Sequence, residues 1–218
     1  MSDMYGVPLS WMRPGCRRAG HLYVSPKKEK YIVSDRNKHV CPVERADSFD
    51  SKIRRCLQNP QKILRPYIEE GMTVLDIGCG PGLFSIDMAQ MVGKSGRVIA
   101  SDLQEGMLQK VRDKIKGTEL EKRITLHKCE ENKIGVSEHV DFGLLFYIVH
   151  EIPNKEGFFN EIGTILKPNG QVLIVEPPFH VSKSSFEETV GKARDAGFTD
   201  IEGPNVLFSK TAILRKGQ

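Results

Sequence analysis

The sequence predicts an α/β fold: a doubly wound, mostly parallel sheet of seven strands that ends in a C-terminal antiparallel hairpin. Two observations support this prediction. Between residues 72 and 196, five short apolar runs alternate with segments of helical periodicity, which is typical of a parallel sheet with helices on both faces. The last two strand-like runs, FTDIE and VLFSKTAILRK, are separated by Gly-Pro-Asn instead of a helix, so we expect them to pair as a hairpin.

The five strands of the parallel part are short and rich in Val, Ile and Leu, as expected for strands that are buried on both faces. They are MTVLDI at 72–77, RVIASD at 97–102, RITLHK at 123–128, a run within HVDFGLLFYI at 139–148, and QVLIVE at 171–176. The turn KPNG precedes the fifth strand.

Helices are predicted between these strands because apolar residues recur there at intervals of three and four. Their ranges are 82–92, 104–116, 154–167 and 184–196. Upstream, Ser48 is a candidate N-cap, and Pro60 marks a break or a fresh start between two helices.

Composition and charge divide the chain into a basic N-terminal extension at 1–47 and a ligand-binding domain at 48–218. Residues 1–45 carry nine Lys or Arg and four Asp or Glu, which accounts for the whole positive excess of the chain. A basic arm can bind nucleic acid or a membrane surface. The alternative, which we favour, is a solvated extension whose few aromatic residues pack on the domain.

Apolar runs and cysteines indicate a cytoplasmic protein. No apolar run approaches the roughly 18 residues that span a bilayer, and the N-terminus lacks the continuous apolar region of a secretory signal. The five cysteines are odd in number and contain no CxxC, which suits a reducing compartment. His39 and Cys41 would need two further ligands to hold a metal, so no metal site is predicted.

The stretch VLDIGCGPG, at residues 74–82, carries glycines at 78, 80 and 82 directly after a strand. Glycine permits a tight turn and lets a ligand approach the backbone. A dehydrogenase loop, G-x-G-x-x-G, would need glycine at position 83, which is Leu. A P-loop would need a GK[ST] ending, which is absent.

Two acids distinguish the expected ligand from a dinucleotide. Asp76 precedes the glycine turn, where it would repel a pyrophosphate and attract an ammonium group, as in the aminoacyl end of S-adenosylmethionine. Asp102 closes the second strand twenty residues after Gly82, and its carboxylate is placed to accept hydrogen bonds from both ribose hydroxyls. A hydrogen bond to a charged acceptor contributes roughly 1.5–3 kcal/mol, so Asp102 is expected to dominate ribose affinity.

Four stretches, VLDIGCGPG, VIASDLQEGML, DFGLLFYIVHEIP and LKPNGQVLIVEP, together resemble the class I S-adenosylmethionine-dependent methyltransferases. The resemblance covers about residues 48–214 and points to the small-molecule group that includes quinone-ring and arsenite methyltransferases. The first motif is specific; the later ones are weaker but fall in the right order. The resemblance implies the Rossmann-like methyltransferase fold, S-adenosylmethionine as cofactor and S-adenosylhomocysteine as product.

The resemblance also implies which residues contact the cofactor. The glycine turn and Asp76 would surround the methionine part, Asp102 the ribose, and Leu103 and Met107 the adenine. An acid after the third strand often meets the adenine amino group, and CEEN offers Glu130 or Glu131, of which we prefer Glu130. The cofactor-binding residues expected are Asp76, Gly78, Cys79, Gly80, Gly82, Asp102, Leu103, Met107, Glu130 and Phe146.

The fourth strand ends in FYIVHEIP, whose tip would line the methyl-transfer site. Tyr147 and His150 are the catalytic candidates there. The alternative for Phe146 and Tyr147 is core packing, and for His150 a polar residue at a helix entry. Glu176-Pro177-Pro178 is only superficially similar to the NPPY box of nucleic-acid amino-methyltransferases, because that box follows the fourth strand; modification of a base is therefore disfavoured.

The expected reaction is methyl transfer to a small acceptor by direct in-line displacement. A thiol, a quinol or phenol, an amine or a metalloid are all candidates, and a base is needed only where the acceptor loses a proton. HVCPVERADSFDSKIRR would form a lid that selects the acceptor, with Arg54 and Arg55 as anion contacts and Cys41 as a contact for a soft substrate. The alternative is an RNA- or protein-associated module that uses the basic arm; a dehydrogenase is a distant third. Oligomeric state is not predicted.

Overall fold

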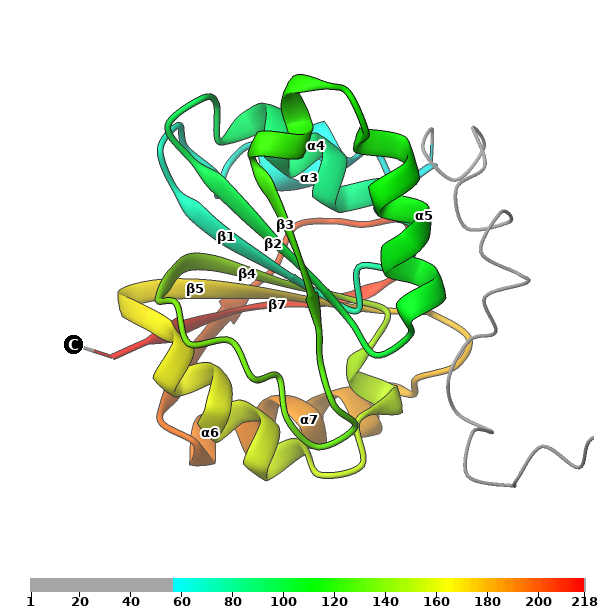
Figure 1. Ribbon diagram of the computed structural model, residues 1–218. Helices are drawn as coiled ribbons and strands as arrows, with labels where there is room; N and C mark the ends of the chain where they lie inside the picture. Colours follow the sequence, from blue (N-terminus) through cyan, green and yellow to red (C-terminus); the bar gives the residue numbers. More distant parts are fainter. Residues whose placement is uncertain (1–56, 218) are drawn as a thin grey trace, which may run out of the picture. The chain divides into compact units, whose positions relative to one another are not determined.

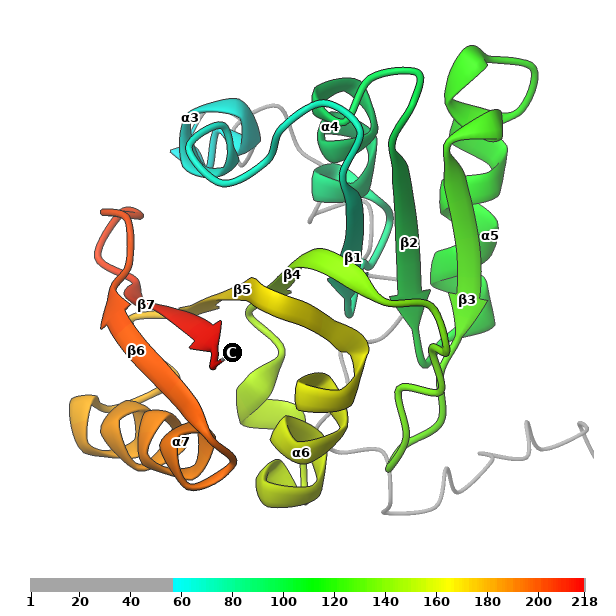
Figure 2. The ribbon, with the colours of Figure 1, turned by 90° about the vertical axis from the view of Figure 1, so that its left-hand side faces the viewer.

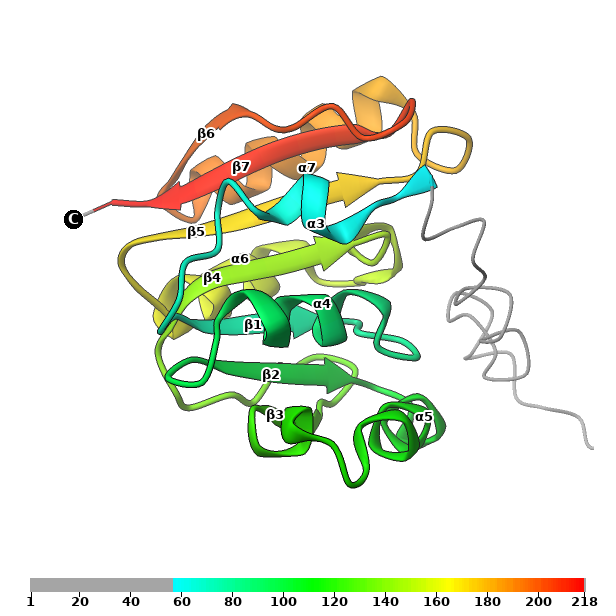
Figure 3. The same cartoon turned by 90° about the horizontal axis from the view of Figure 1, so that it is seen from above.

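The computed structural model describes residues 57–217, in which seven strands form one sheet of order β3-β2-β1-β4-β5-β7-β6. The strands are β1 Thr73–Ile77, β2 Arg97–Asp102, β3 Ile124–Lys128, β4 Val140–Phe146, β5 Leu166–Glu176, β6 Phe198–Glu202 and β7 Lys210–Lys216. Strands β1 to β5 are parallel, and β7 pairs antiparallel with both β5 and β6 (Figure 3). The predicted fold class is confirmed.

Helices cover both faces of this sheet. One face carries α3 Pro60–Leu64, α4 Leu83–Met91 and α5 Glu105–Ile115, and the other carries α6 Lys155–Ile165 and α7 Lys183–Asp195 (Figures 1 and 2). Two short 3₁₀ helices are η3 Glu119–Lys122 and η4 Val149–Glu151. Each face has its own buried apolar cluster, one under α3, α4 and α5 and the other under α6 and α7. Burial on both sides explains why the central strands are almost wholly apolar.

Local sequence signals account for where the helices begin. Pro60 is the first residue of α3, which confirms the predicted fresh start. The side chain of Asn154 accepts a hydrogen bond from the N–H of Gly157 at the start of α6, and Ser182 accepts one from Ser185 at the start of α7. Such caps satisfy backbone donors that have no partner within the helix.

Two boundaries differ from the prediction. Strand β5 begins at Leu166, so the expected KPNG turn lies inside the strand, where Asn169 has a positive φ of 62°. Lys167 holds this part in place: its Nζ binds both carboxylate oxygens of Asp141, near the start of β4, each at 2.8 Å. The connection of the last hairpin is also longer than Gly-Pro-Asn and spans 203–209, because Val206 is buried in the core instead of extending β7.

Several predictions fall on residues outside the described range: the helix after Ser48, the extension at 1–47, and the roles of Cys41, Arg54 and Arg55. Among residues 57–217, no helix has the length and apolar character needed to cross a membrane. In the same range, no three or more His, Cys, Asp or Glu side chains are grouped so as to hold a metal ion.

Candidate active site at the carboxyl ends of the strands

The glycine turn joins β1 to α4 at the sheet edge where ligands of doubly wound folds bind. The backbone N–H groups of Gly78 and Cys79 donate to the carbonyl of Ser101 in β2, at 2.8 and 3.0 Å. The turn is therefore anchored to the neighbouring strand. Gly78, Gly80 and Gly82 have φ values of 70°, 54° and 86°, which glycine adopts at little cost.

The three glycines meet different surroundings. A Cβ added at Gly78 would lie 2.8 Å from Cγ1 of Ile148, and one at Gly82 would lie 3.0 Å from Cγ2 of Val111. These two positions are closed by the protein itself. A Cβ at Gly80 would meet no atom of the described residues within 4 Å. The middle of the turn thus borders open space that a ligand can occupy.

Asp102 is held against this turn at the end of β2. One carboxylate oxygen accepts the N–H of Gly80 at 2.9 Å, and the other accepts the N–H of Gln104 at 2.8 Å. The backbone N–H of Leu103 is a third donor to this carboxylate. An ionised carboxylate has about four acceptor sites, so it retains capacity to accept from a ligand hydroxyl, such as that of a ribose. Burial raises the pKa of Asp102, while the backbone donors Gln104, Gly80 and Leu103 lower it.

Asp76, near the end of β1, is buried, with 2 % of its surface exposed. Its carboxylate accepts a hydrogen bond from the Ser85 hydroxyl in the first turn of α4, at 2.5 Å. Burial raises the pKa of Asp76 to about 7; the bond from Ser85 opposes this rise, and the charge of Asp102 adds to it. A cationic ligand group nearby would favour the ionised form, so the ammonium group of S-adenosylmethionine fits this position.

The residues expected near the adenine come to the same edge. Met107 is buried in the first turn of α5, and Leu103 is half-buried directly after β2. The N–H of Cys129 donates to the Asp102 carbonyl at 3.2 Å, which places the end of β3 beside Asp102. Glu130 follows in an exposed bridge to Lys133. Its contact with the adenine remains a prediction.

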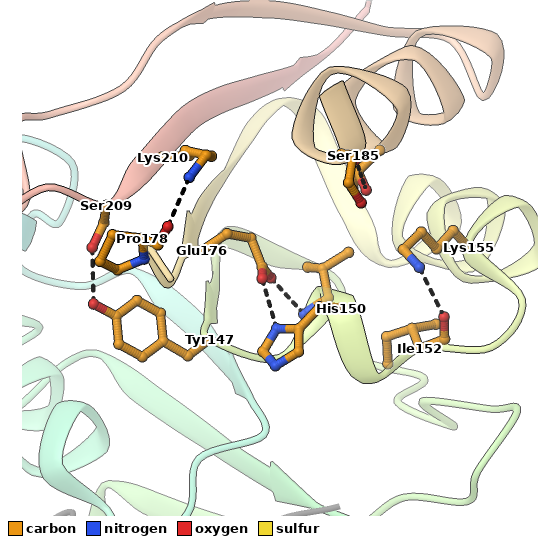
Figure 4. Close-up of polar contacts among 11 residues, drawn as sticks. Tyr147, His150, Ile152, Lys155, Glu176, Pro178, Ser185, Ser209 and Lys210 are labelled. Atoms are coloured by element: carbon orange, nitrogen blue, oxygen red, sulfur yellow. Dashed lines mark hydrogen bonds and ion pairs between the residues drawn. The ribbon is translucent and has the colours of Figure 1, made fainter. Parts of the chain in front are cut away.

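The tip of β4 places the next candidates. Phe146 is buried against Phe84 and Tyr147, with ring centroids 4.2 and 4.5 Å apart. The Tyr147 hydroxyl is hydrogen-bonded to the Ser209 hydroxyl at 2.8 Å and accepts a bond from the side-chain amide of Gln58 at 2.9 Å. Figure 4 shows the bond to Ser209. These contacts give Phe146 and Tyr147 structural roles, and their expected functional roles remain predictions.

His150, in η4, contacts an acid that the sequence analysis did not assign. Its Nδ1 lies 2.6 Å from Oε2 of Glu176, the last residue of β5, and Oε1 of Glu176 accepts the N–H of Val149 at 2.8 Å (Figure 4). The hydrogen bond to Glu176 raises the pKa of His150, while partial burial opposes the rise. The sequence signal was present: Glu176 closes QVLIVE as Asp102 closes RVIASD.

Acidic side chains surround this edge of the sheet. Asp76, Asp102 and Glu176 are buried at the ends of β1, β2 and β5, and Glu151 lies in η4 after β4. Burial raises the pKa of Glu151 to about 7, and the charges of Asp102 and Glu176 add to the effect. The resulting negative potential suits a ligand that carries positive sulfonium and ammonium groups.

Fold and site together define an S-adenosylmethionine-dependent methyltransferase domain. Residues 68–201 match the family model described as Methyltransferase domain, and the chain belongs to this family. A crystal structure of an S-adenosylmethionine-dependent methyltransferase from Aquifex aeolicus is 27% identical and superposes with a TM-score of 0.71, covering 81% of this chain and 98% of that one.

Curated relatives include quinone methyltransferases. Demethylmenaquinone methyltransferase of Lactobacillus johnsonii is 32% identical over 110 residues, 50% of this chain and 45% of that protein. A ubiquinone/menaquinone biosynthesis C-methyltransferase of Azotobacter vinelandii is 27% identical over 130 residues, 59% of this chain and 49% of that protein. The chain spans about half the length of these curated relatives.

Proposed function

We propose that the protein methylates a small molecule with a quinol or phenol group. The observation that carries the proposal is the open space at Gly80, bordered by the Asp102 carboxylate. When bound there, S-adenosylmethionine supplies a methyl carbon on a positively charged sulfur, which leaves as a neutral thioether. A cytoplasmic location, consistent with the cysteine content, is part of the proposal.

In this proposal the chain's own residues hold and orient the cofactor. Asp102 binds the ribose hydroxyls through its carboxylate, and Asp76 compensates the ammonium group. The backbone at Gly80 provides the close approach, because no side chain among residues 57–217 fills the space beside it. Correct placement of two reactants is worth effective molarities of roughly 10⁵–10⁸ M, so binding and alignment supply most of the catalysis.

The quinol or phenol class is supported by the names of the relatives and by His150. Both curated relatives described above are named for quinone methylation. A quinol or phenol becomes a strong nucleophile when it loses its proton, and a histidine is the usual general base near neutral pH. His150, in η4 after β4, is assigned this role in the proposal; Tyr147 is the second candidate.

The test is a screen for S-adenosylhomocysteine release with quinols, phenols, thiols, amines and arsenite as acceptors. The proposal predicts turnover with 1,4-naphthohydroquinone or a simple phenol and none with arsenite. Turnover confined to thiols or arsenite would overturn the acceptor class but keep the methyltransferase. Absence of S-adenosylmethionine binding would overturn the proposed function as a whole.

A further inference from the structure

We propose that Glu176 is the positioning residue of His150: its carboxylate holds the proton of Nδ1, so that Nε2 is free to take a proton from the acceptor. The inference rests on the proposed function and deepens it, because it restricts the acceptor to molecules that give up a proton on methylation. Glu176 itself touches neither acceptor nor cofactor in this account and acts only through His150.

The hydrogen bonds of Glu176 determine which ring nitrogen of His150 carries the proton. Glu176 is 1% exposed, and its Oε1 accepts the N–H of Val149. Its Oε2 lies 2.6 Å from Nδ1 of His150, and in the proposed arrangement the carboxylate is ionised, so that this oxygen can only accept. Nδ1 must then be the donor. In the neutral imidazole, Nε2 is therefore the nitrogen with the free lone pair.

The second ring nitrogen of His150, Nε2, is not engaged by Glu176. Figure 4 shows the second ring nitrogen of His150 pointing away from Glu176. The side chain of His150 is 31% exposed, and no hydrogen bond from the described part of the chain occupies Nε2. Ile148, two residues earlier, closes the space beside Gly78. His150 therefore lies two residues after a side chain that packs against the glycine turn.

Proton transfer balances within this arrangement. As the acceptor oxygen forms its bond to the methyl carbon, the carbon–sulfur bond of the cofactor breaks and the O–H proton moves to Nε2 of His150; water later takes that proton. The imidazolium charge that forms meanwhile is compensated by Glu176. Within residues 57–217, the other charged or titratable groups that face His150 are Glu151 in η4, Lys155 in α6 and His180, whose ring lies 6.5 Å away. A thiolate or arsenite has no such proton to lose, so its methylation would not depend on Glu176.

Nitrogen-15 NMR of the imidazole rings tests the proposal without any acceptor. The spectrum of His150→Ala assigns the His150 signals. In the wild-type protein at a pH above its titration, the proposal predicts that neutral His150 carries its proton on Nδ1. A proton on Nε2 in the neutral ring would overturn it, whether or not the protein turns over any substrate.

Glu176→Gln reverses the hydrogen-bond direction at His150. If the glutamine oxygen keeps the bond from Val149, its NH₂ group faces Nδ1, which must then accept, and the neutral proton moves to Nε2. In serine proteases the corresponding Asp→Asn change fixes the wrong tautomer and lowers kcat about 10⁴-fold. We expect the His150 titration to shift to lower pH, and kcat with 1,4-naphthohydroquinone to fall by roughly 10²–10⁴-fold, the usual contribution of a general base.

Binding measurements separate this inference from the proposed function. Glu176→Gln should bind S-adenosylmethionine within about twofold of wild type, and Glu187→Gln, an exposed change on α7, should alter neither kcat nor the His150 signals. An unchanged His150 titration in Glu176→Gln would overturn the inference alone. If the variant fails to fold, the wild-type tautomer and the pH profile of His150→Ala still decide the question.

Discussion

Gly80 and Gly117 are a matched pair of residues that separates backbone strain from ligand contact. Both have positive φ, 54° and 72°, and a Cβ at either would meet no described atom within 4 Å. Gly80 lies in the cofactor turn, whereas Gly117 lies in the connection between α5 and η3.

Gly80→Ala and Gly117→Ala should therefore cost similar stability but differ in binding. A non-glycine residue in the left-handed region costs about 1–2 kcal/mol. Only Gly80→Ala should lower the affinity for S-adenosylmethionine. We expect a loss of roughly tenfold or more, and tenfold corresponds to about 1.4 kcal/mol of binding free energy. Chemical unfolding and calorimetry measure the two effects. Equal affinities in the two variants would remove the turn from the binding site.

Asp76 predicts a stability that depends on pH. Its pKa of about 7 in the folded protein lies well above the ordinary value of about 3.8. The folded state therefore binds more protons between these values, and stability falls as pH rises from about 4 to about 7. Asp76→Asn should reduce the decrease in the free energy of unfolding between pH 4 and pH 7. The ligand-free variant should therefore be more stable than wild type at pH 8.

The same substitution should weaken S-adenosylmethionine binding, because it removes the negative charge that compensates the ammonium group. Thermal unfolding at pH 5 and pH 8 gives the stability difference; Asp113→Asn, an exposed change in α5, is the control. Because the pKa of Glu151 is also about 7, the stability of Asp76→Asn should still decrease somewhat with rising pH. A steeper loss of stability in Asp76→Asn than in wild type would contradict this account.

The positions of some site residues could be predicted from the sequence, and those of others could not. Asp102 was predicted correctly as an acid that closes a strand beside a glycine turn, because strand ends and turns are both local patterns. Glu176 closes a strand in the same way, yet its partner His150 is 26 positions away. Their pairing depends on β4 and β5 lying side by side, which no local pattern encodes. The burial of Asp76 is likewise a property of the packed sheet.

At the scale of elements, the Tyr147 hydroxyl joins three segments: the tip of β4, the 203–209 connection through Ser209, and Gln58 ahead of α3. Tyr147 also has a positive φ of 61°, and its N–H donates to Val175 at 2.8 Å. If these contacts are its main role, Tyr147→Phe should lower the free energy of unfolding by about 1 kcal/mol and leave kcat within a few-fold.

A much larger loss of kcat in Tyr147→Phe, without a change in stability, would instead support the catalytic role. Ser209→Ala supplies the comparison, since it removes one partner of the hydroxyl and leaves the tyrosine in place. Stopped assays of S-adenosylhomocysteine release and urea unfolding curves provide the two readouts.

Element boundaries were predicted well where periodicity and caps agreed and less well at irregular backbone. Strand β2 coincides with the predicted 97–102, and α5 differs by one residue at each end. The KPNG motif indicated a turn, but Lys167 ties that stretch to Asp141 on the neighbouring strand, so it continues as an irregular part of β5. A tertiary contact overrode the local turn signal.

For the molecule as a whole, every expected cofactor residue lies after residue 47. We propose that removal of residues 1–47 leaves S-adenosylmethionine affinity unchanged within about twofold and alters the turnover of the acceptor, as a lid would. If the basic segment instead binds nucleic acid, the full chain should show RNA affinity that falls steeply with salt, and the deletion should abolish it. Filter binding at two salt concentrations distinguishes these outcomes.

The central claim is that the carboxylates of Asp76 in β1 and Asp102 in β2 bind S-adenosylmethionine. Calorimetric titration of the full chain with S-adenosylmethionine tests it most directly, with Asp102→Asn and Asp102→Ala alongside wild type. The account predicts saturable one-site binding to wild type and a loss of affinity of at least roughly 10-fold in Asp102→Ala, since even one hydrogen bond to a charged group contributes about 1.5–3 kcal/mol. No heat with wild type, or full affinity in Asp102→Ala, would contradict it.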